Sequence, residues 1–314
     1  MSDPALSIVL AVPHDDAVRD GSLAAALHAI AQSVAGVPSG LTYEVLVVAA
    51  NAPVQPLLPT RHIASTPGAL TPVLWGLGLR AASGRVVAFT TSQMRVSAPW
   101  AAALLDAISG GVDAGVVGAG GPIALPAVAP VAAADAATDA ATLVRFSAFL
   151  PGRWPRVMSA HDIPGDNAAY LRAHLMEHDD PLRDGFWEIE FHRRFARAGK
   201  QLLMVPVALA TAQGAVDLRA LRAQRFAHAV SFGRSRVGRH HQSALRIVLA
   251  APLVPLVLLA RIARRARAAG VDGGRIRRAL PAVLRLTTAW AAGEAVGAWQ
   301  AAVGRGNQVT FAHE

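Results

Sequence analysis

Four residues in the middle of the chain have side chains of the types that bind metal ions. His161 and Asp162 are adjacent, and His174 and His178 are four residues apart, a spacing that aligns two imidazoles on one face of a helix. A structural or catalytic metal centre needs three or four ligands in a fixed arrangement. The sequence offers no third ligand at a matching spacing, so we interpret these histidines as surface residues and predict no metal ligands.

Several other catalytic signatures are missing from the sequence. The chain has no cysteine, which excludes thiol nucleophiles, disulfides and Cys-ligated metals. It has no Walker motif and no Gly-x-Ser-x-Gly elbow, and the glycines at 118–121 are too loosely arranged for a phosphate loop. Carboxylates remain: Glu188 and Glu190 lie near the start of a helical segment. A carboxylate is favoured there by the helix dipole, whether it serves as a general base or only as a helix-start charge.

Arginine supplies nearly all of the positive charge. The 314 residues include 30 basic and 21 acidic side chains, a formal net charge of +9, and Lys200 is the only lysine. Arginine keeps its charge at any working pH and binds phosphate oxygens in pairs. The excess is consistent with a solvated basic surface or with a partner that carries phosphates. The basic residues lie beside apolar helices rather than among exposed aromatics, so we predict no nucleic-acid partner.

Apolar strand patterns alternate with helical patterns along the first two thirds of the chain. The expected strands are Ser7–Val12, Tyr43–Val48, Arg85–Thr90 and Ala114–Val117, and the expected helices between them begin at Asp20, Thr71 and Ala98. This alternation predicts an α/β fold with a doubly wound, mainly parallel sheet. The Ala/Pro-rich segment 120–142 has no clear period and is expected to form a loop. We place the domain boundary between residues 215 and 216, so that the domains are 1–215 and 216–314.

The order of several short motifs resembles that of family 2 glycosyltransferases, which have the GT-A fold. The matching segments are 7–16 (SIVLAVPHDD), 43–48 (YEVLVV), 85–89 (RVVAF), 99–100 (PW), 165–172 (GDNAAYLR) and 187–199 (WEIEFHRRFARAG). They look like the family's opening strand and turn, its second strand, the strand before its metal-binding Asp-x-Asp, and two later motifs. No single segment is specific. The ordered set, over roughly residues 7 to 210, carries the resemblance.

The resemblance breaks at the positions where the family holds nucleotide and metal. The acidic pair after the second strand is replaced by Ala49 and Ala50, and Asp-x-Asp is replaced by Thr91-Ser92-Gln93. Carboxylates bind the divalent cation that bridges the donor's diphosphate. Thr91 and Gln93 offer dipolar oxygens without charge. Mg²⁺ or Mn²⁺ is therefore a doubtful cofactor for this chain.

The resemblance implies a nucleotide-sugar site built from residues that follow the strands. It assigns the catalytic base to Glu188, with Glu190 as the competing residue. The implied donor-binding residues are Pro13, His14, Asp15, Ala49, Asn51, Thr91, Gln93, Asn167 and Trp187. A turn or capping role is an equal alternative for His14 and Asp15, and Asn167 could instead close a turn.

Arginines that follow the predicted first domain could replace the missing cation. Arg234 and Arg236 could bind the leaving diphosphate, because guanidinium groups pair with phosphate oxygens bidentately. The favoured alternative is that they contact membrane phosphates.

Two apolar stretches near the C-terminus predict a membrane-associating helical region. Ile247–Ala260 is shorter than the approximately 20 residues of a spanning helix and contains two prolines. Ala279–Trp299 is longer but carries Arg285 and Glu294, and charges at mid-bilayer are costly. We therefore expect a re-entrant or in-plane pair at the cytoplasmic face of the membrane, with its arginines among anionic head groups. A helical hairpin packed on protein is the alternative.

These features predict a glycosyltransferase that moves a sugar from a nucleotide-sugar donor to a lipid-linked or polysaccharide acceptor at the cytoplasmic membrane face. The alternative is a catalytically inactive GT-A protein that serves as a membrane-bound scaffold or partner of another glycosyltransferase. The neutral residues at 49, 50, 91 and 93 favour the inactive protein, whereas Glu188 favours the enzyme.

Overall fold

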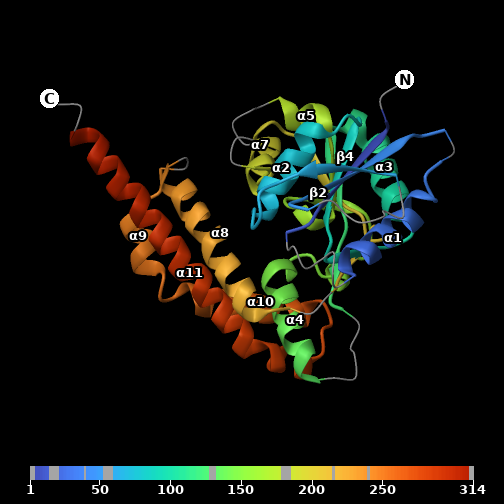
Figure 1. Cartoon of the computed structure of the whole chain (residues 1–314). Helices are drawn as coiled ribbons and strands as arrows, with labels where there is room; N and C mark the ends of the chain where they lie inside the picture. The colour runs from blue at the N-terminus through green and yellow to red at the C-terminus, as the bar shows by residue number, and fades with distance from the viewer. Residues whose placement is uncertain are drawn as a thin grey trace. The chain divides into compact units, whose positions relative to one another are not determined.

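Two groups of elements make up the computed structural model (Figure 1). The structure describes residues 4–13, 21–38, 40–51, 59–126, 132–177, 185–213, 216–238 and 241–310. The first unit consists of Met1–Pro126 and Phe149–Gly214, and the second of Ala127–Ala148 and Ala215–Glu314. The boundary expected at 215/216 lies within one residue of the last junction. The segment 127–148 nevertheless groups with the C-terminal helices, which the sequence did not indicate.

Among the described residues, an eight-stranded sheet forms the centre of the first unit. Its spatial order is β3 (Thr60–Ala64), β2 (Tyr43–Ala49), β1 (Leu6–Ala11), β4 (Val86–Thr91), β9 (Ala168–Leu171), β6 (Val116–Gly120), β10 (Gln201–Met204) and β8 (Met158–Ala160). The strands from β3 to β4 are parallel, as are β6 and β10. The β9 and β8 strands run antiparallel to their neighbours. The expected α/β class with a mainly parallel sheet is confirmed.

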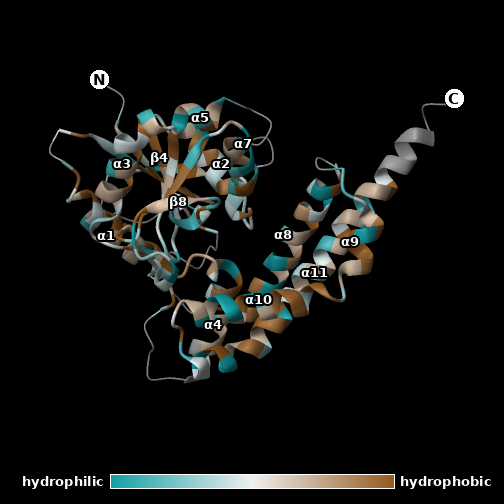
Figure 2. Ribbon diagram, turned by 180° about the vertical axis from the view of Figure 1, so that it is seen from behind, coloured by the Kyte–Doolittle hydropathy of each residue, from teal (hydrophilic) through white to brown (hydrophobic). Residues whose placement is uncertain are grey.

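Both faces of this sheet are covered, which explains why its strands are continuous apolar runs. All six residues of β1 are buried, and successive side chains point to opposite faces. Val9 packs in one core cluster with Leu74 and Trp75 of α2 (Thr71–Ala81). Figures 1 and 2 show α1 (Ser22–Val34) and α3 (Trp100–Gly111) on the opposite side of the sheet from α2.

A smaller sheet of β5 (Met94–Val96), β11 (Ala210–Ala212) and β7 (Ile123–Ala124) continues from the carboxyl ends of the large one. Two residues separate the end of β4 from the start of β5, and two residues separate the end of β6 from the start of β7. This sheet therefore fixes the short connections that leave β4 and β6 at their carboxyl ends.

The second unit is helical, and its longest helices lie side by side (Figure 1). It contains α4 (Ala132–Phe146), α8 (Leu218–Gly238), α9 (Ala244–Ala250), α10 (Val254–Ala268) and α11 (Gly273–Thr310). No single described helix is long and apolar enough to cross a membrane. The α9–α10 pair, bent by 68°, satisfies the length and composition criteria together.

The prediction of a loop at 120–142 is wrong for residues 132–142, which belong to α4. Alanine has the highest helix propensity. The helix is held by tertiary contacts, which the sequence pattern did not reveal: Arg275 of α11 forms a bidentate ion pair with the buried carboxylate of Asp139, at 2.5 and 2.6 Å. A buried carboxylate needs such a partner, so this ion pair ties α4 to α11.

Three glycines allow α8 and α11 to approach closely. A β-carbon on Gly297 would lie 2.0 Å from the carbonyl oxygen of Val230, and one on Gly293 would lie 2.4 Å from that of Phe226. On the α8 side, a β-carbon on Gly233 would lie 2.2 Å from the carbonyl oxygen of Glu294. Backbone atoms cannot move aside as side chains can, so no larger residue fits this seam.

Substitution of Gly297 by alanine is expected to destabilise the second unit by about 1–3 kcal/mol, because the added methyl group forces the two helices apart. Gly304→Ala, in the same helix, is the matched control. A β-carbon on Gly304 meets nothing within 4 Å, so helix propensity should make that change neutral or stabilising by up to about 1 kcal/mol. Urea denaturation followed by circular dichroism measures both. Equal stability of the two variants would contradict the close α8–α11 contact.

Candidate active site

The carboxyl ends of β1 and β4 adjoin where the strand order of the large sheet reverses. The chain proceeds from β1 outward to β2 and β3, and then returns to the other side of β1 to form β4. The amide of Ser92 donates a hydrogen bond to the carbonyl of Ala11 at 2.9 Å, which joins the two strand ends. Open α/β sheets bind ligands outside the carboxyl ends of their strands at such a point. This edge is therefore the candidate site.

Five of the residues implied by the resemblance follow the strands at this edge. They are Pro13 after β1, Ala49 and Asn51 at the end of β2, and Thr91 and Gln93 at the end of β4. Ala49 is buried, and its carbonyl accepts hydrogen bonds from the amide of Ser65 and from His62 Nε2. Asn51 is exposed. His14 and Asp15 lie outside the described residues.

Three consecutive hydroxyl groups are buried where β4 ends. Thr90 Oγ1, Thr91 Oγ1 and Ser92 Oγ have no hydrogen-bond partner among the described residues. An unsatisfied buried hydroxyl costs about 1–3 kcal/mol, so these three groups are candidates for hydrogen bonds to a ligand. Nothing in the sequence pattern distinguished Thr90 and Ser92 from the neighbouring neutral residues.

The residues at this edge do not fit a divalent cation. Hydroxyl and amide oxygens lack the negative charge with which carboxylates hold Mg²⁺ or Mn²⁺. The described part of the chain contains no group of three or more His, Cys, Asp or Glu that could hold a metal ion. We therefore derive no step of the chemistry through a metal.

Glu188, the first residue of α7 (Glu188–Arg197), lies next to this edge. A β-carbon on Gly165 would be 3.0 Å from Cδ of Glu188 and 3.0 Å from Cζ3 of Trp75. Trp75 Nε1 in turn donates to the carbonyl oxygen of Thr90 at 3.2 Å. Because Gly165 has no side chain, the half-buried carboxyl of Glu188 can sit against this loop, close to the end of β4.

Gly185 and Phe186 anchor the start of α7. They precede Trp187, which is half-buried and occupies the N-cap position of the helix. Gly185 has a φ of +108°, and a β-carbon on it would lie 2.6 Å from backbone atoms of Pro72. The next amide, that of Phe186, donates to the carbonyl of Pro72 at 2.7 Å. The Phe186 ring stacks on Phe89 of β4 with a centroid distance of 4.4 Å. These contacts hold Trp187 and Glu188 beside the sheet.

Asn167 is fully buried, and its amide is used by the fold. Its Nδ2 group donates to the carbonyls of Pro122 and Ala208 at 3.0 and 2.9 Å, and its Oδ1 accepts from Trp100 Nε1 at 2.5 Å. Both amide N–H groups are engaged, and their partners lie 41 and 45 residues away, so the side chain joins distant segments instead of closing its own turn. We do not retain it in the proposed donor site.

A chain of hydrogen bonds runs from the protein surface to the core beside Glu188. His192 Nε2 lies 2.8 Å from Tyr170 Oη, and His192 Nδ1 lies 3.3 Å from Asp162 Oδ1. An ionised carboxylate can only accept, so we assign the ring proton to Nδ1, and Tyr170 Oη then donates to Nε2. His192 follows Glu188 by four residues, so the two lie on the same face of α7. The short segment 162–165 therefore contacts both residues, His192 through Asp162 and Glu188 through Gly165. Sequence reasoning considered Asp162 only as a metal ligand and missed His192 and Tyr170.

Burial and hydrogen bonding shift the pKa values of the three side chains in this hydrogen-bonded network. Burial lowers the pKa of His192 below 6.5, mainly by desolvation, and the hydrogen bond from His192 lowers the pKa of Asp162 below 3.8. Burial raises the pKa of Tyr170, with a smaller contribution from the negative charge of Glu188. At neutral pH, His192 and Tyr170 are thus neutral while Asp162 is ionised.

The remaining histidines of interest are not gathered into a metal site. His161 is exposed and lies 3.4 Å from the carboxylate of Asp162. His174 forms a 2.6 Å contact with Glu177. His178 lies outside the described residues. The exposure of His161 agrees with its interpretation as a surface side chain, whereas His174 is partly buried.

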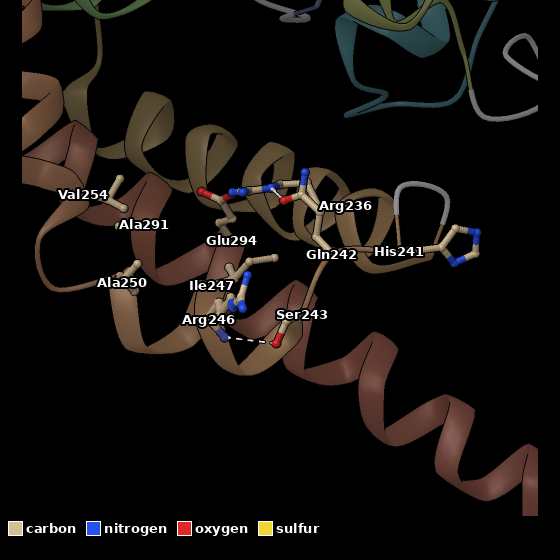
Figure 3. A pocket seen from close by; sticks show the side chains of 11 residues that line it. Arg236, His241, Gln242, Ser243, Arg246, Ile247, Ala250, Val254, Ala291 and Glu294 are labelled. Carbon is tan, nitrogen blue, oxygen red and sulfur yellow. Dashed lines mark hydrogen bonds and ion pairs between the residues drawn. The ribbon is translucent and has the colours of Figure 1, made fainter.

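The two arginines expected near the diphosphate belong to the second unit. Arg234 Nε and Nη2 donate to Gln300 Oε1, at 3.1 and 2.6 Å. Arg236 donates to Gln242 and forms an ion pair with the buried carboxylate of Glu294 (Figure 3). Arg236 and Glu294 help to line a cavity of about 760 Å³ between α8, α9 and α11. Their expected contact with the donor stays a prediction.

A different arginine of the second unit, Arg225, is partly exposed, but its Nε atom is buried. Arg225 stacks on Trp290 at 4.2 Å, and its Nε has no hydrogen-bond partner among the described residues. Desolvation, followed by the nearby charge of Arg145, lowers the pKa of Arg225 to about 9. The same two causes, together with Arg225 itself, lower the pKa of His228 to about 4. The cation–π contact partly offsets the cost of burying Arg225.

Comparisons with known proteins give only distant structural likenesses. No family model matches the chain, and no curated protein matches it. A crystal structure of GalNAc-T7 with UDP, GalNAc and Mn²⁺ has a TM-score of 0.47 and 15% identity, over 69% of this chain and 45% of that one. The mannosyltransferase PcManGT from Pyrobaculum calidifontis, in complex with GDP-Man and Mn²⁺, has a TM-score of 0.44 and 16% identity, over 99% of this chain and 80% of that one.

The chain thus spans less than half the length of the GalNAc-T7 structure. At these scores, neither likeness transfers an activity to this protein.

The buried His192 makes stability depend on pH. Below pH 6.5 the unfolded chain takes up a proton on this residue that the folded protein does not, so stability is full above pH 6.5 and falls as the pH decreases toward the folded pKa. Asp162 adds a further loss below pH 3.8. Each tenfold difference in proton affinity is worth about 1.4 kcal/mol. Urea unfolding between pH 7.5 and 5.0 should show a smaller loss in His192→Gln than in the wild type.

His228 contributes to the pH dependence of both proteins, so its effect cancels in the difference. Identical pH slopes for the wild type and His192→Gln would contradict a buried, neutral His192.

Proposed function

We propose that the protein is a glycosyltransferase that uses a nucleotide-sugar donor and needs no divalent cation held by carboxylates. The observation that carries the proposal is the position of Glu188, whose half-buried carboxyl lies against Gly165 and Trp75 beside the end of β4. A carboxylate is thereby held at the sheet edge where ligands bind in open α/β folds. The ordered motifs from residue 7 to about 210 supply the assignment to glycosyl transfer and to family 2.

Glu188 acts as the general base in this proposal. Its carboxylate removes the proton of the acceptor hydroxyl as that oxygen bonds to the anomeric carbon of the donor sugar, and the bond from that carbon to the diphosphate breaks. The competing residue, Glu190, follows Glu188 by two residues on α7. Its Oε1 atom lies 3.7 Å from Nη1 of Arg193. The structure therefore supports Glu188 over Glu190 for this role.

The nucleotide portion of the donor would lie along the ends of β1, β2 and β4. Pro13, Asn51, Thr91, Gln93 and Trp187 remain the proposed contacts there. The buried hydroxyls of Thr90, Thr91 and Ser92 have no partner among the described residues, and such groups gain free energy when a ligand supplies the missing hydrogen bonds.

The acceptor is proposed to be a lipid-linked sugar or a polysaccharide at the cytoplasmic face of the membrane. This part of the proposal is supported by the charge and apolar surface of the C-terminal helices. Residues 218–271 contain arginines and no Asp or Glu, a composition that suits anionic head groups.

A catalytically inactive GT-A scaffold is the second candidate. The specific observation in its favour is the absence of any carboxylate at 49–51 and 91–93, where only alanine, asparagine, threonine, serine and glutamine occur. Such a protein would bind a membrane or a partner glycosyltransferase without turnover.

Glu188→Gln should lower the rate of sugar transfer by about 10²–10⁴-fold, because the amide cannot accept the acceptor proton. The affinity for the nucleotide should change little. Glu190→Gln is the matched control, with the same chemical change in the same helical turn, and should retain turnover. Release of nucleoside diphosphate from a panel of nucleotide sugars measures the rate. Equal rates for wild type and Glu188→Gln would contradict the assignment of the base.

Titration calorimetry with UDP, GDP and TDP, with Mn²⁺ or with EDTA, tests the donor site. One nucleotide should bind equally well under both conditions, because positions 49–51 and 91–93 offer no carboxylate to hold a cation. Binding that requires Mn²⁺ would contradict the metal-independent site. Failure of every nucleotide to bind the folded protein would support the inactive scaffold.

A further inference from the structure

The corner between α9 and α10 exposes a row of large apolar side chains. The row consists of Leu245, Leu249, Leu253, Leu256 and Val257, each more than half exposed, with Leu249 at 69%. The brown segments of α9 and α10 in Figure 2 mark the same stretch. In the first unit, by contrast, the exposed large apolar residues occur singly or in pairs. A continuous exposed apolar row on a protein surface marks an interaction site.

The α9 and α10 helices each have a buried apolar side and, apart from it, an exposed apolar side formed by this row. Leu245 and Leu249 are four residues apart on α9, and Leu253, Leu256 and Val257 follow an i, i+3, i+4 spacing at the start of α10, so each set lies on one side of its own helix. Ile247 of α9 and Ile262 of α10 are buried, so their side of each helix packs within the unit. The exposed side is therefore additional to the packing that holds the unit together.

Arginine flanks this apolar row, and acidic residues are absent from it. Arg246 on α9 and Arg261 and Arg264 on α10 are exposed. The sequence contains no Asp or Glu between Leu218 and Val271. An apolar protein partner would not require this charge, whereas an anionic lipid surface attracts each nearby arginine by about 1 kcal/mol. The positive charge of these arginines therefore favours an anionic lipid surface over an apolar protein partner.

The dimensions suit the surface of a bilayer better than its full thickness. The α10 helix has 15 residues, roughly 22 Å at 1.5 Å per residue, and the hydrocarbon core is about 30 Å thick. The 68° bend between α9 and α10 directs the two helices along different axes. Helices that lie in the interface bury their apolar side about 5–10 Å deep, at the boundary of head groups and acyl chains.

We propose that the α9–α10 corner docks on an anionic lipid bilayer, with the five apolar side chains in the interface and Arg246, Arg261 and Arg264 among the lipid phosphates. This surface gives the proposed function its contact with the membrane, and in that respect it rests on that function. Its test measures no catalysis.

Flotation of the purified full-length chain with vesicles tests the docking surface. Vesicles of phosphatidylcholine alone are compared with vesicles that also contain phosphatidylglycerol. The wild type should float with the anionic vesicles, bind the neutral ones at least tenfold more weakly, and lose affinity as NaCl is raised, because salt screens the arginine–phosphate attraction.

Val257→Glu should reduce binding to anionic vesicles at least tenfold, because it places a carboxylate in the interface beside anionic lipid. Val207→Glu is the matched control: the two valines are 53% and 57% exposed, but Val207 lies in the first unit. It should bind vesicles like the wild type. Arg246→Gln should weaken binding to anionic vesicles only, by several-fold.

Circular dichroism melting must show that both glutamate variants are folded. If Val257→Glu binds anionic vesicles as well as Val207→Glu does, the surface is wrongly assigned. If the wild type binds no vesicle but self-associates, and Val257→Glu abolishes that association, the occupant is a second copy of the chain and the proposal is overturned.

Nucleotide calorimetry on the same proteins separates this proposal from the proposed function. Val257→Glu should bind the nucleotide as the wild type does. Loss of vesicle binding with nucleotide binding retained supports the docking surface, whatever the fate of the transferase assignment.

Discussion

The buried amide of Asn167 connects three segments that are distant in the sequence. It binds the indole of Trp100 in α3 and the carbonyls of Pro122 and Ala208, which adjoin two strands of the smaller sheet. A buried amide is costly unless its polar atoms are satisfied, so these bonds favour one arrangement of the segments. The same 3₁₀ turn contains Gly165, against which Glu188 rests. The geometry of the candidate site therefore depends on a residue that serves the fold.

The α7 helix combines a proposed chemical role with a structural one. Glu188 and His192 are one turn apart on the same face, and the loop from Asp162 to Gly165 contacts both. His192 is buried and tied to Tyr170 of β9, so it cannot shift without breaking a buried hydrogen bond. This arrangement fixes the carboxylate of Glu188 relative to the sheet without any metal ion, through packing and hydrogen bonds alone.

In the second unit, one side of α9 and α10 packs inside the unit and the other side is exposed. Glycines in α8 and α11 bring the two backbones together, and an ion pair holds α4 to α11. This packing is satisfied within the unit, yet α9 and α10 retain large apolar side chains on the outside. Exposed leucines contribute nothing to the stability of the isolated unit, because only burial removes apolar surface from water. The proposed docking on a bilayer would bury them.

The sequence alone predicted the strands β1, β2, β4 and β6 and the α/β class, because parallel strands buried on both faces are continuous apolar runs. The family resemblance pointed to Glu188 as the base, and that role stays a prediction. The sequence did not reveal α4, the role of Asn167, or the Tyr170–His192–Asp162 chain. Those depend on contacts between residues 22 to 136 positions apart. Only the tertiary structure decides such contacts, because the partner that satisfies a buried polar group can lie anywhere in the chain.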